Sequence, residues 1–340
     1  MPLGKVCTLR RMFKVGSGSL QYELVENWEQ LPDGYRHADV AGVCTDASGN
    51  VYLFCRGDHP VMIYDRDGKF LDAWGEGQFS YRTHGMYMGQ DDSLFLVDDS
   101  NHTVGKYSLD GKLQFRLGPS ETPSNTGDYD GRSPETVTQA GGPFNRPTNL
   151  AVAPGGDLFV SDGYGNTRIH RFDAHGQLCE SWGQPGSGPG QFRIPHSTWV
   201  HTDGRVFVCD RENDRIQIFS PNGEYLTEWL DVQRPQDIFI DKDDRVYVGE
   251  LVWRAGMRSF RRGPIEVEEP ARLSIFDLQG NVLLRWGGAD AAQPGNFVAP
   301  HGIWVDDRGD IYMAEVTDTI GVKPGIVPEG THTFQKFARV

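Results

Sequence analysis

One pattern of strands and turns recurs six times along the chain, and this repetition restricts the possible folds more than any other feature. Each unit of roughly 40 residues contains four short runs rich in apolar and β-branched residues, separated by turns with Gly, Asn or Asp, which is typical of a β-propeller blade. The second run of each unit is the clearest, and these runs lie at 51–54, 94–97, 158–160, 206–208, 246–248 and 311–313.

The sixth unit lacks a fourth strand, and the missing strand is predicted at the other end of the chain. Residues 333–340 match a third strand such as 215–219, whereas 22–28 has the form of the fourth strands at 70–74 and 225–229. Pairing these two ends would remove the open sheet edges that invite aggregation. We therefore predict an all-β protein, a six-bladed β-propeller of the NHL type, in which the N-terminal strand closes the last blade.

We expect residues 1–340 to form a single domain. The expected blades cover about 40–75, 83–118, 147–183, 195–230, 235–287 and 300–340, the last of them completed by 22–28.

Three segments interrupt the repeat, at 119–146, 252–270 and 317–331. Long insertions in a compact domain are usually functional or mobile. The segment 252–270 carries four arginines and is equally compatible with a lid and with a passive excursion of the chain.

The composition excludes several classes of function. The net charge is −14 and no basic cluster exceeds two residues, which argues against a nucleic-acid partner. The five cysteines contain no C-x-x-C pair, which disfavours both a disulfide framework and a thiolate zinc site. No apolar run has the length of a signal peptide or a spanning helix, so we expect a cytoplasmic protein without a membrane partner.

Histidine occupies one repeat position in alternate units. The first strands of a propeller line its axis, so equivalent residues of alternate blades are related by a near three-fold axis and converge on one point. Three imidazoles with open positions suit a catalytic zinc ion, which iron or manganese could replace. A lone histidine would be an ordinary polar channel residue, but the regular alternation favours a metal site. The histidines are His84, His196 and His301, and the equivalent residues of the other units are Ala41, Thr148 and Gln236.

The ends of the second strands carry two further repeat positions. An acid recurs at the first of them in five units, and we interpret it as a structural device that binds loop backbone. At the next position stand Arg56 and Arg211, which could hold a substrate carboxylate in a bidentate manner, or form rim ion pairs with acids such as Asp58 and Glu212. Tyr164, in the equivalent loop of the third unit, is either a packing residue or a base near the metal.

The residues at these positions resemble the peptidyl-α-hydroxyglycine α-amidating lyase family, the metal-dependent NHL-type propeller half of the peptide C-terminal amidation system. The resemblance spans about residues 40–315. A D-x-x-N-x-R-I core alone is common in NHL propellers, but its combination with R-G-D-H and three spaced histidines is specific. The matching segments are 54–59, 83–86, 159–169, 190–197, 208–217 and 299–302.

The resemblance implies a role for each site residue. Tyr164 would be the general base, and Arg56 and Arg211 would hold the substrate carboxylate and assist the base. The family reaction breaks the C–N bond of a carbinolamide and gives an amide and glyoxylate. The implied zinc ligands are His84, His196 and His301.

The sequence also departs from the family. Gly302 replaces an aspartate that helps to hold a calcium ion, which argues against a structural calcium, and Ala299 replaces a methionine, so the substrate side of the pocket has changed. Two family disulfides are absent. The residues at their positions are Gly165 with Asn145, and Phe207 with Ile218.

Three functions remain open. The first is a metal-dependent lyase acting on a small, anionic, hydroxylated substrate of the carbinolamide or α-hydroxy acid type. The second is a lactonase-like hydrolase or hydratase that uses metal-bound hydroxide. The third is a non-catalytic NHL binding scaffold, against which the histidine pattern argues. The fold alone cannot decide between them, because propellers host many functions.

Overall fold

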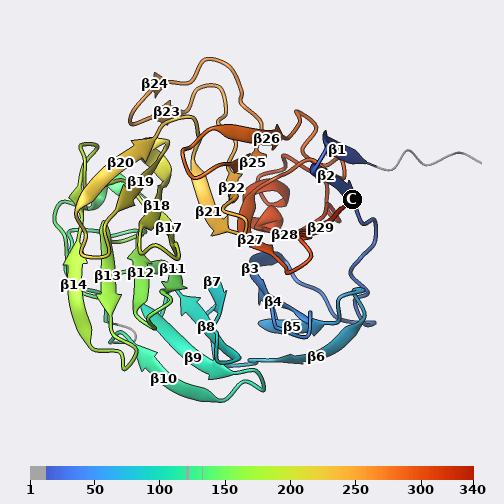
Figure 1. Cartoon of the computed structure of the whole chain (residues 1–340), viewed down its shortest axis with the longest axis horizontal. Coiled ribbons are helices and arrows are strands. Elements are labelled where there is room, and N and C mark those ends of the chain that lie inside the picture. Colours follow the sequence, from blue (N-terminus) through green and yellow to red (C-terminus); the bar gives the residue numbers. More distant parts are fainter. Residues whose placement is uncertain (1–12, 120–121, 132) are drawn as a thin grey trace, which may run out of the picture.

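Six sheets, each with four or five antiparallel strands, surround a central axis in the computed structural model (Figure 1), which describes residues 13–119, 122–131 and 133–340. This arrangement confirms the predicted six-bladed propeller. In every blade the first strand is innermost, and the fourth is outermost except in blade six, where a fifth strand lies outside it. Blade one contains β3 (Asp39–Thr45), β4 (Val51–Arg56), β5 (Val61–Tyr64) and β6 (Phe70–Trp74), and blade two contains β7 (Thr83–Met88), β8 (Ser93–Asp98), β9 (Thr103–Ser108) and β10 (Leu113–Leu117).

The remaining blades repeat this arrangement. Blade three contains β11 (Pro147–Val152), β12 (Leu158–Asp162), β13 (Arg168–Phe172) and β14 (Leu178–Trp182), and blade four contains β17 (Pro195–Val200), β18 (Val206–Asp210), β19 (Arg215–Phe219) and β20 (Tyr225–Trp229). Blade five contains β21 (Pro235–Ile240), β22 (Val246–Glu250), β25 (Arg272–Phe276) and β26 (Val282–Trp286). Blade six contains β27 (Pro300–Val305), β28 (Ile311–Glu315), β29 (Phe334–Arg339), β2 (Leu20–Leu24) and β1 (Lys14–Ser17).

The ring closes through the N-terminal strand, as predicted. β2 pairs antiparallel with β29, placing Tyr22 opposite Arg339. The predicted bounds of 22–28 were wrong, however, because the strand ends at Leu24 and the chain turns at Asn27, whose φ is 53°. The turn lets Trp28 leave the sheet and pack on Tyr64 and Tyr312, between blades one and six. The edge strand β1 was not foreseen.

Tryptophan–glycine contacts lock neighbouring blades together. Gly223, in the turn before β20, has a φ of +81°, and a Cβ placed there would lie 2.7 Å from Cδ2 of Trp182 at the end of β14. Gly280 stands in the same way against Trp229, one blade further on. The turn glycine therefore provides both the positive φ and the space that the tryptophan of the preceding blade requires.

Gly223→Ala should destabilise the protein more than Gly204→Ala. Both glycines have positive φ, but a Cβ on Gly204 would have its nearest contact at 3.7 Å, from Pro221. Gly204→Ala, the control, should lose about 1–3 kcal/mol of unfolding free energy because of backbone strain alone. Gly223→Ala should lose about 1–3 kcal/mol more, because the new methyl overpacks the Trp182 ring. Denaturant unfolding of both variants measures the difference, and equal losses would contradict the proposed lock.

Aromatic rings fill one end of the axis. They stand three residues after the aligned first-strand position, and neighbouring ring centroids are 4.6–6.1 Å apart. The histidine end of the channel is therefore approached from the opposite mouth. The rings belong to Tyr87, Trp199, Phe239 and Trp304.

The described residues of the three insertions form only short elements. The segment 119–146 includes η1 (Pro134–Thr136), and 317–331 includes the π-helical turn η3 (Asp318–Val322). A parallel pair, β15 (Gln184–Pro185) with β16 (Gln191–Phe192), precedes blade four.

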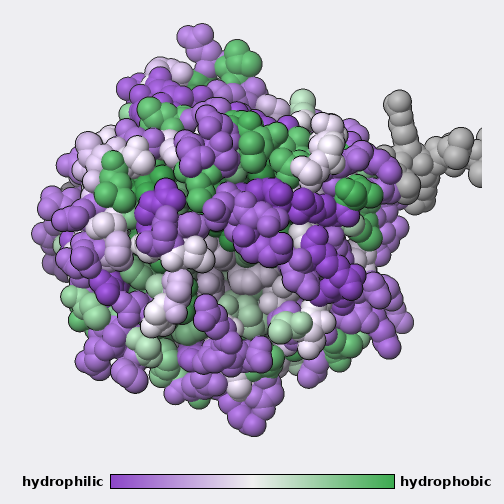
Figure 2. Space-filling model, viewed as in Figure 1, coloured by the Kyte–Doolittle hydropathy of each residue, from purple (hydrophilic) through white to green (hydrophobic). Residues whose placement is uncertain are grey.

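Hydrophilic residues dominate the rim of the face in Figure 2, with apolar residues gathered between them. No helix in the described parts of the chain is long and apolar enough to cross a membrane.

The segment 252–270 lies at the rim of the ring in Figure 1, where it forms β23 (Arg258–Ser259) and β24 (Gly263–Pro264). It is fastened to blade four. Trp253 Nε1 donates to Asp214 at 2.7 Å and Arg262 Nε donates to the same carboxylate at 3.1 Å. In this conformation the segment therefore lies against blade four at the rim.

Candidate active site

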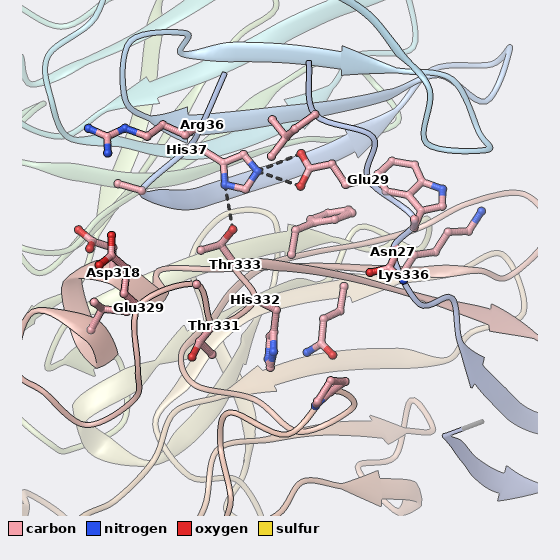
Figure 3. A pocket seen from close by; sticks show the side chains of 18 of the residues that line it. Asn27, Glu29, Arg36, His37, Asp318, Glu329, Thr331, His332, Thr333 and Lys336 are labelled. Carbon is pink, nitrogen blue, oxygen red and sulfur yellow. Dashed lines mark hydrogen bonds and ion pairs between the residues drawn. The ribbon is translucent and has the colours of Figure 1, made fainter. Parts of the chain in front are cut away.

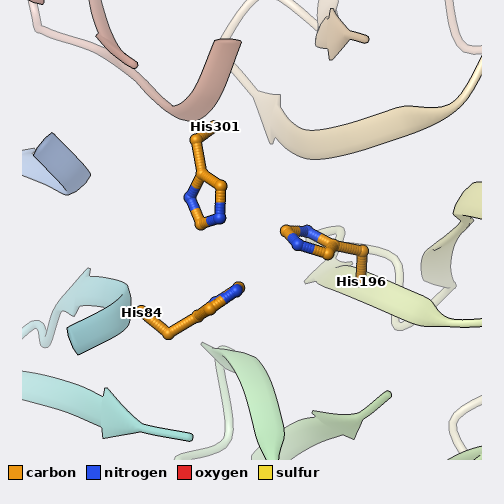
Figure 4. Close-up of side chains that lie close together, drawn as sticks. All are labelled: His84, His196 and His301. Atoms are coloured by element: carbon orange, nitrogen blue, oxygen red, sulfur yellow. The ribbon is translucent and has the colours of Figure 1, made fainter. Parts of the chain in front are cut away.

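The three aligned histidines converge on the axis (Figure 4), as predicted. Each stands second in the innermost strand of its blade, and their ligand atoms all lie within 4.8 Å of one another. The side chains are buried, with 1% of His84, 2% of His196 and 5% of His301 exposed. The repeat has therefore placed three imidazoles at one point on the axis.

Hydrogen bonds fix the tautomer of each ring. Every Nδ1 donates to a backbone carbonyl at the equivalent position of the next blade, which leaves Nε2 as the lone-pair nitrogen. Each histidine is thus oriented by the backbone of the blade that follows its own. The bonds run from His84 to Thr148 (2.5 Å), from His196 to Gln236 (2.7 Å) and from His301 to Ala41 (2.7 Å).

The centre favours neutral imidazoles and fits a divalent cation. Burial lowers the pKa of His84 and His196 well below the ordinary range, and burial with the charge of Arg56 lowers the pKa of His301 to about 3. Nε2 of His301 is buried without a hydrogen-bond partner, which is costly unless something binds it. Three neutral imidazoles with inward nitrogens are a ligand set suited to zinc, and also to iron or manganese.

Tyr164 places its hydroxyl over the histidines. It belongs to the loop that follows β12, and its Oη lies 3.3 Å from His84 Nε2 and 3.1 Å from His196 Nε2. Arg211 Nη1 donates to the same oxygen at 3.4 Å. The tyrosine is therefore positioned to exchange a proton with a molecule bound at the centre.

Arg211 begins the 3-10 turn η2 (Arg211–Asn213) and forms the ion pair with Glu212 that was one of the two roles considered for it. Its Nε donates to Glu212 at 2.8 Å, while Nη1 donates to Tyr164 and, at 3.2 Å, to Gln236. Although burial alone would raise the pKa of Glu212, the guanidinium groups of Arg234 and Arg211 lower it to about 2. The carboxylate thus stays charged and holds Arg211 in place.

Arg56 ends β4 and is held by an acid that differs from the suggested Asp58. Its Nη1 donates to Asp39 at 3.2 Å and its Nε donates to the carbonyl of Thr83 at the same distance. Asp39 also accepts the backbone N–H of Thr319 at 3.0 Å, so the 317–331 insertion contributes to the site through it. The arginine therefore reaches the backbone directly before His84.

Arg82 is a site residue that the sequence did not single out. Its Cζ lies 5.3 Å from the centroid of the Tyr164 ring, and Arg211 Cζ lies 5.4 Å from it. Asp99 holds the Arg82 guanidinium. Asp99 occupies the same repeat position as Arg56 and Arg211. An acid at this position is unusual, and it was the feature of the sequence that could have pointed to Arg82.

The mouth has one polar and one apolar side. Blades five and six carry Leu251 and Val316 where blades one and four carry arginine, and both are buried. They belong to one apolar cluster with Ala41, Val298, Ala299 and Val327. A ligand at the centre would therefore meet guanidinium groups on one side and hydrocarbon on the other.

The recurring acids bind loop backbone, as predicted. Each accepts a backbone N–H from the loop that leads into the first strand of its own blade. The bond thus fixes the point along the propeller axis at which that strand begins. The acceptors are Asp98, Asp162, Asp210, Glu250 and Glu315, and the donors are Ser80, Asn145, Arg193, Gln233 and Val298.

The positions implied by family disulfides lie against each other. Gly165 N donates to the carbonyl of Asn145 at 3.0 Å, and Phe207 is paired with Ile218 across β18 and β19. Thr126 of the first insertion joins Gly165 to the Asn145 side chain, so hydrogen bonds hold the Tyr164 loop. The cysteines of the described residues are all free, and Cys7 lies outside those residues.

A separate cleft of about 980 Å³ opens between blade six, the 25–38 linker and the 317–331 insertion (Figure 3). Its histidines already have partners. His37 is bonded to Glu29 at 2.9 Å and to Thr333 at 2.8 Å, and His332 lies 3.2 Å from Glu315. The converging ligand set is at the axis, not in this cleft.

Comparison with known proteins agrees with this architecture. The NHL repeat model matches residues 144–172 and 192–219, in blades three and four. NHL repeat-containing protein 3 of Homo sapiens is 32% identical over 313 residues, covering 87% of this chain and 81% of that protein. The chain belongs to the NHL-repeat family.

Other relatives of this NHL-repeat chain are named as lyases or as amidating enzymes. Peptidyl-α-hydroxyglycine α-amidating lyase 1 of Drosophila melanogaster is 34% identical over 263 residues, covering 73% of this chain and 45% of that protein. Peptidylglycine α-amidating monooxygenase of Rattus norvegicus is 27% identical over 86% of this chain. The NHL-repeat chain spans only 32% of the length of the rat protein.

Solved structures support the propeller fold of the NHL-repeat chain. A streptogramin B lyase superimposes with a TM-score of 0.56, at 14% identity, covering 93% of this chain and 85% of that one. A gluconolactonase of Xanthomonas campestris gives 0.58 at 11% identity, covering 96% and 94%. At such identities the likeness concerns the fold alone.

Proposed function

We propose that the protein is a metal-dependent lyase that cleaves the C–N bond of a small anionic carbinolamide, R–CO–NH–CH(OH)–COO⁻. The observation that carries the proposal is the Tyr164 hydroxyl, 3.1–3.3 Å from the inward nitrogens of two of three neutral histidines. The names of the lyase relatives support the same reaction class. An α-hydroxy acid of similar shape would use the same groups.

Each group of site residues has its own role in the proposed reaction. The three histidines would hold a zinc ion, or iron or manganese, which when bound supplies Lewis-acid polarisation of the substrate hydroxyl. Arg56 and Arg211 bind the substrate carboxylate, and Leu251 and Val316 line the side that receives the acyl group. This arrangement presents the hydroxyl proton to Tyr164.

The reaction needs no added water. Tyr164, as the phenolate, takes the hydroxyl proton, the O–H electron pair becomes the new C=O bond, and the C–N pair leaves with the amide nitrogen. That nitrogen receives the proton from Tyr164, so the products are the amide and glyoxylate and the phenolate is regenerated. Arg211, which donates to Tyr164 Oη, stabilises the phenolate while the tyrosine lacks its proton.

N-benzoyl-α-hydroxyglycine tests the proposal. Zinc-loaded protein should convert it to benzamide and glyoxylate in equal amounts, and in H₂¹⁸O the benzamide should contain no ¹⁸O. Hydrolysis of the amide would instead give benzoate that carries ¹⁸O. Formation of labelled benzoate, or absence of turnover across a panel of N-acyl groups and α-hydroxy acids, would refute the lyase.

Arg56→Lys and Arg211→Lys should each raise KM for this substrate by roughly 10- to 100-fold, the value of a charge-assisted hydrogen bond. Lysine keeps the charge but loses the planar pair of donors that matches a carboxylate. The methyl ester of the substrate is the control, because it lacks the anionic group and should show much smaller changes in KM. Wild-type kcat/KM in both variants on the acid would contradict the clamp.

A further inference from the structure

Two guanidinium groups from different blades flank the ring of Tyr164. Arg211 comes from blade four, and Arg82 from the loop directly before β7 of blade two. Their Cζ atoms lie 5.4 Å and 5.3 Å from the ring centroid, within the range of cation–π attraction. Tyr164 itself lies in blade three, so the two arginines come from the two blades next to its own.

Arg82 is itself rigidly held. Its Nε donates to both carboxylate oxygens of Asp99 at 2.9 Å, and Asp99 N donates to the Arg82 carbonyl at 3.4 Å. The Asp99 side chain is fully buried, whereas 21% of the Arg82 side chain is exposed. The guanidinium plane is therefore fixed by a buried carboxylate at the edge of the mouth.

The Tyr164 side chain depends on such support. Its backbone is tied by an N–H bond to the carbonyl of Arg146 at 3.3 Å, and the hydroxyl contacts are all longer than 3.0 Å. Those contacts go to groups that a bound metal and substrate would also engage. Of the two cations over the ring, Arg82 is the one that makes none of these hydroxyl contacts.

We infer that Arg82, anchored by Asp99, is a positioning residue that holds the Tyr164 ring over the histidine centre without touching the substrate. The inference rests on the proposed function, in which Tyr164 is the base. A displacement of the Tyr164 hydroxyl by about 1 Å can lower the rate on the order of 100-fold. Loss of the Arg82 contact should therefore change kcat more than it changes substrate binding.

The test compares Arg82→Met with Arg82→Lys, using N-benzoyl-α-hydroxyglycine and zinc-loaded protein. Arg82→Met should lower kcat roughly 3- to 30-fold, the strength of a cation–π contact, with KM changed less than about two-fold. Arg82→Lys, which keeps the cation, should retain more activity than Arg82→Met. Arg171→Met is the matched control, because Arg171 is also paired to an acid, Asp157, lies 5.9 Å from the Phe159 ring and is 25% exposed.

A double-mutant cycle with Tyr164→Phe identifies the route of the effect. If Arg82 acts through the tyrosine as a base, Arg82→Met should cause little further loss of kcat in the Tyr164→Phe background. An undiminished loss there, a rise in KM alone, or an equal loss in Arg171→Met would each overturn the inference. Asp99→Asn gives a second variant with the same expected sign if Arg82→Met folds poorly.

A crystal structure of metal-free Arg82→Met provides a readout independent of turnover, because a bound metal would itself replace the contacts between Tyr164 and the histidines. The Tyr164 hydroxyl should no longer lie within about 3.5 Å of both His84 and His196, the limit of a hydrogen bond. An unmoved ring would refute the positioning role even if the lyase activity is confirmed. Conversely, normal turnover by Tyr164→Phe would refute the proposed base while a displaced ring still supported the role of Arg82.

Discussion

Tyr164→Phe should lower kcat on the carbinolamide substrate by about 10²–10⁴-fold, the usual cost of losing a general base. Phenylalanine keeps the ring between Arg82 and Arg211 but removes the hydroxyl that lies 3.1 Å from His196 Nε2. The metal content should stay unchanged, because the three imidazoles are intact. Steady-state kinetics together with elemental analysis of the same preparation measure both quantities.

The same variant separates a lyase from a hydrolase. A lyase must pass the hydroxyl proton of its substrate to a base, whereas a hydrolase that activates water at the metal could lose the tyrosine and keep most of its rate. Tyr87→Phe is a matched control, since Tyr87 belongs to the aromatic group at the other end of the axis. Near-normal turnover by Tyr164→Phe, with its metal retained, would rule out the mechanism proposed here.

His196→Ala should abolish activity and greatly weaken metal binding. Outer-shell changes at metal sites already cost about 10–100-fold in affinity, so loss of one of three ligands should cost more. Purified wild-type protein, produced with zinc, iron and manganese available, should contain about one equivalent of metal per chain, because the site has one set of ligands. Elemental analysis after dialysis against a mild chelator measures retention.

The control for this variant is His201→Ala. His201 directly follows β17, the strand that carries His196, is also buried, and contacts Asp244 at 3.0 Å. It should keep the metal and the activity. Wild-type protein free of transition metal, or equal metal content in both variants, would contradict the metal centre.

The repeat made the fold and the histidine centre predictable from sequence. A fixed period converts a position in the sequence into a position around the axis, so His84, His196 and His301 could be placed together without any knowledge of their contacts. The same reasoning found the strand that closes the ring. It failed beyond Leu24, because a single turn at Asn27 moved Trp28 out of the sheet while preserving its packing role.

Contacts that cross between strands or loops were harder to predict. Nearness in sequence suggested Asp58 as a partner of Arg56, but the β3–β4 pairing places Asp39 directly opposite it. Arg82 was missed because it lies in a connecting loop, whose path the repeat does not determine. Its contact with Tyr164 depends on three neighbouring blades that meet at that ring.

The aromatic group of Tyr87, Trp199, Phe239 and Trp304 packs across one end of the axis, so the histidine centre would be reached from the opposite mouth. A reaction that splits one molecule into two at that centre would release both fragments through the mouth that admitted the substrate. Under the proposed reaction, either product at high concentration would therefore compete with the substrate for the same mouth of the channel.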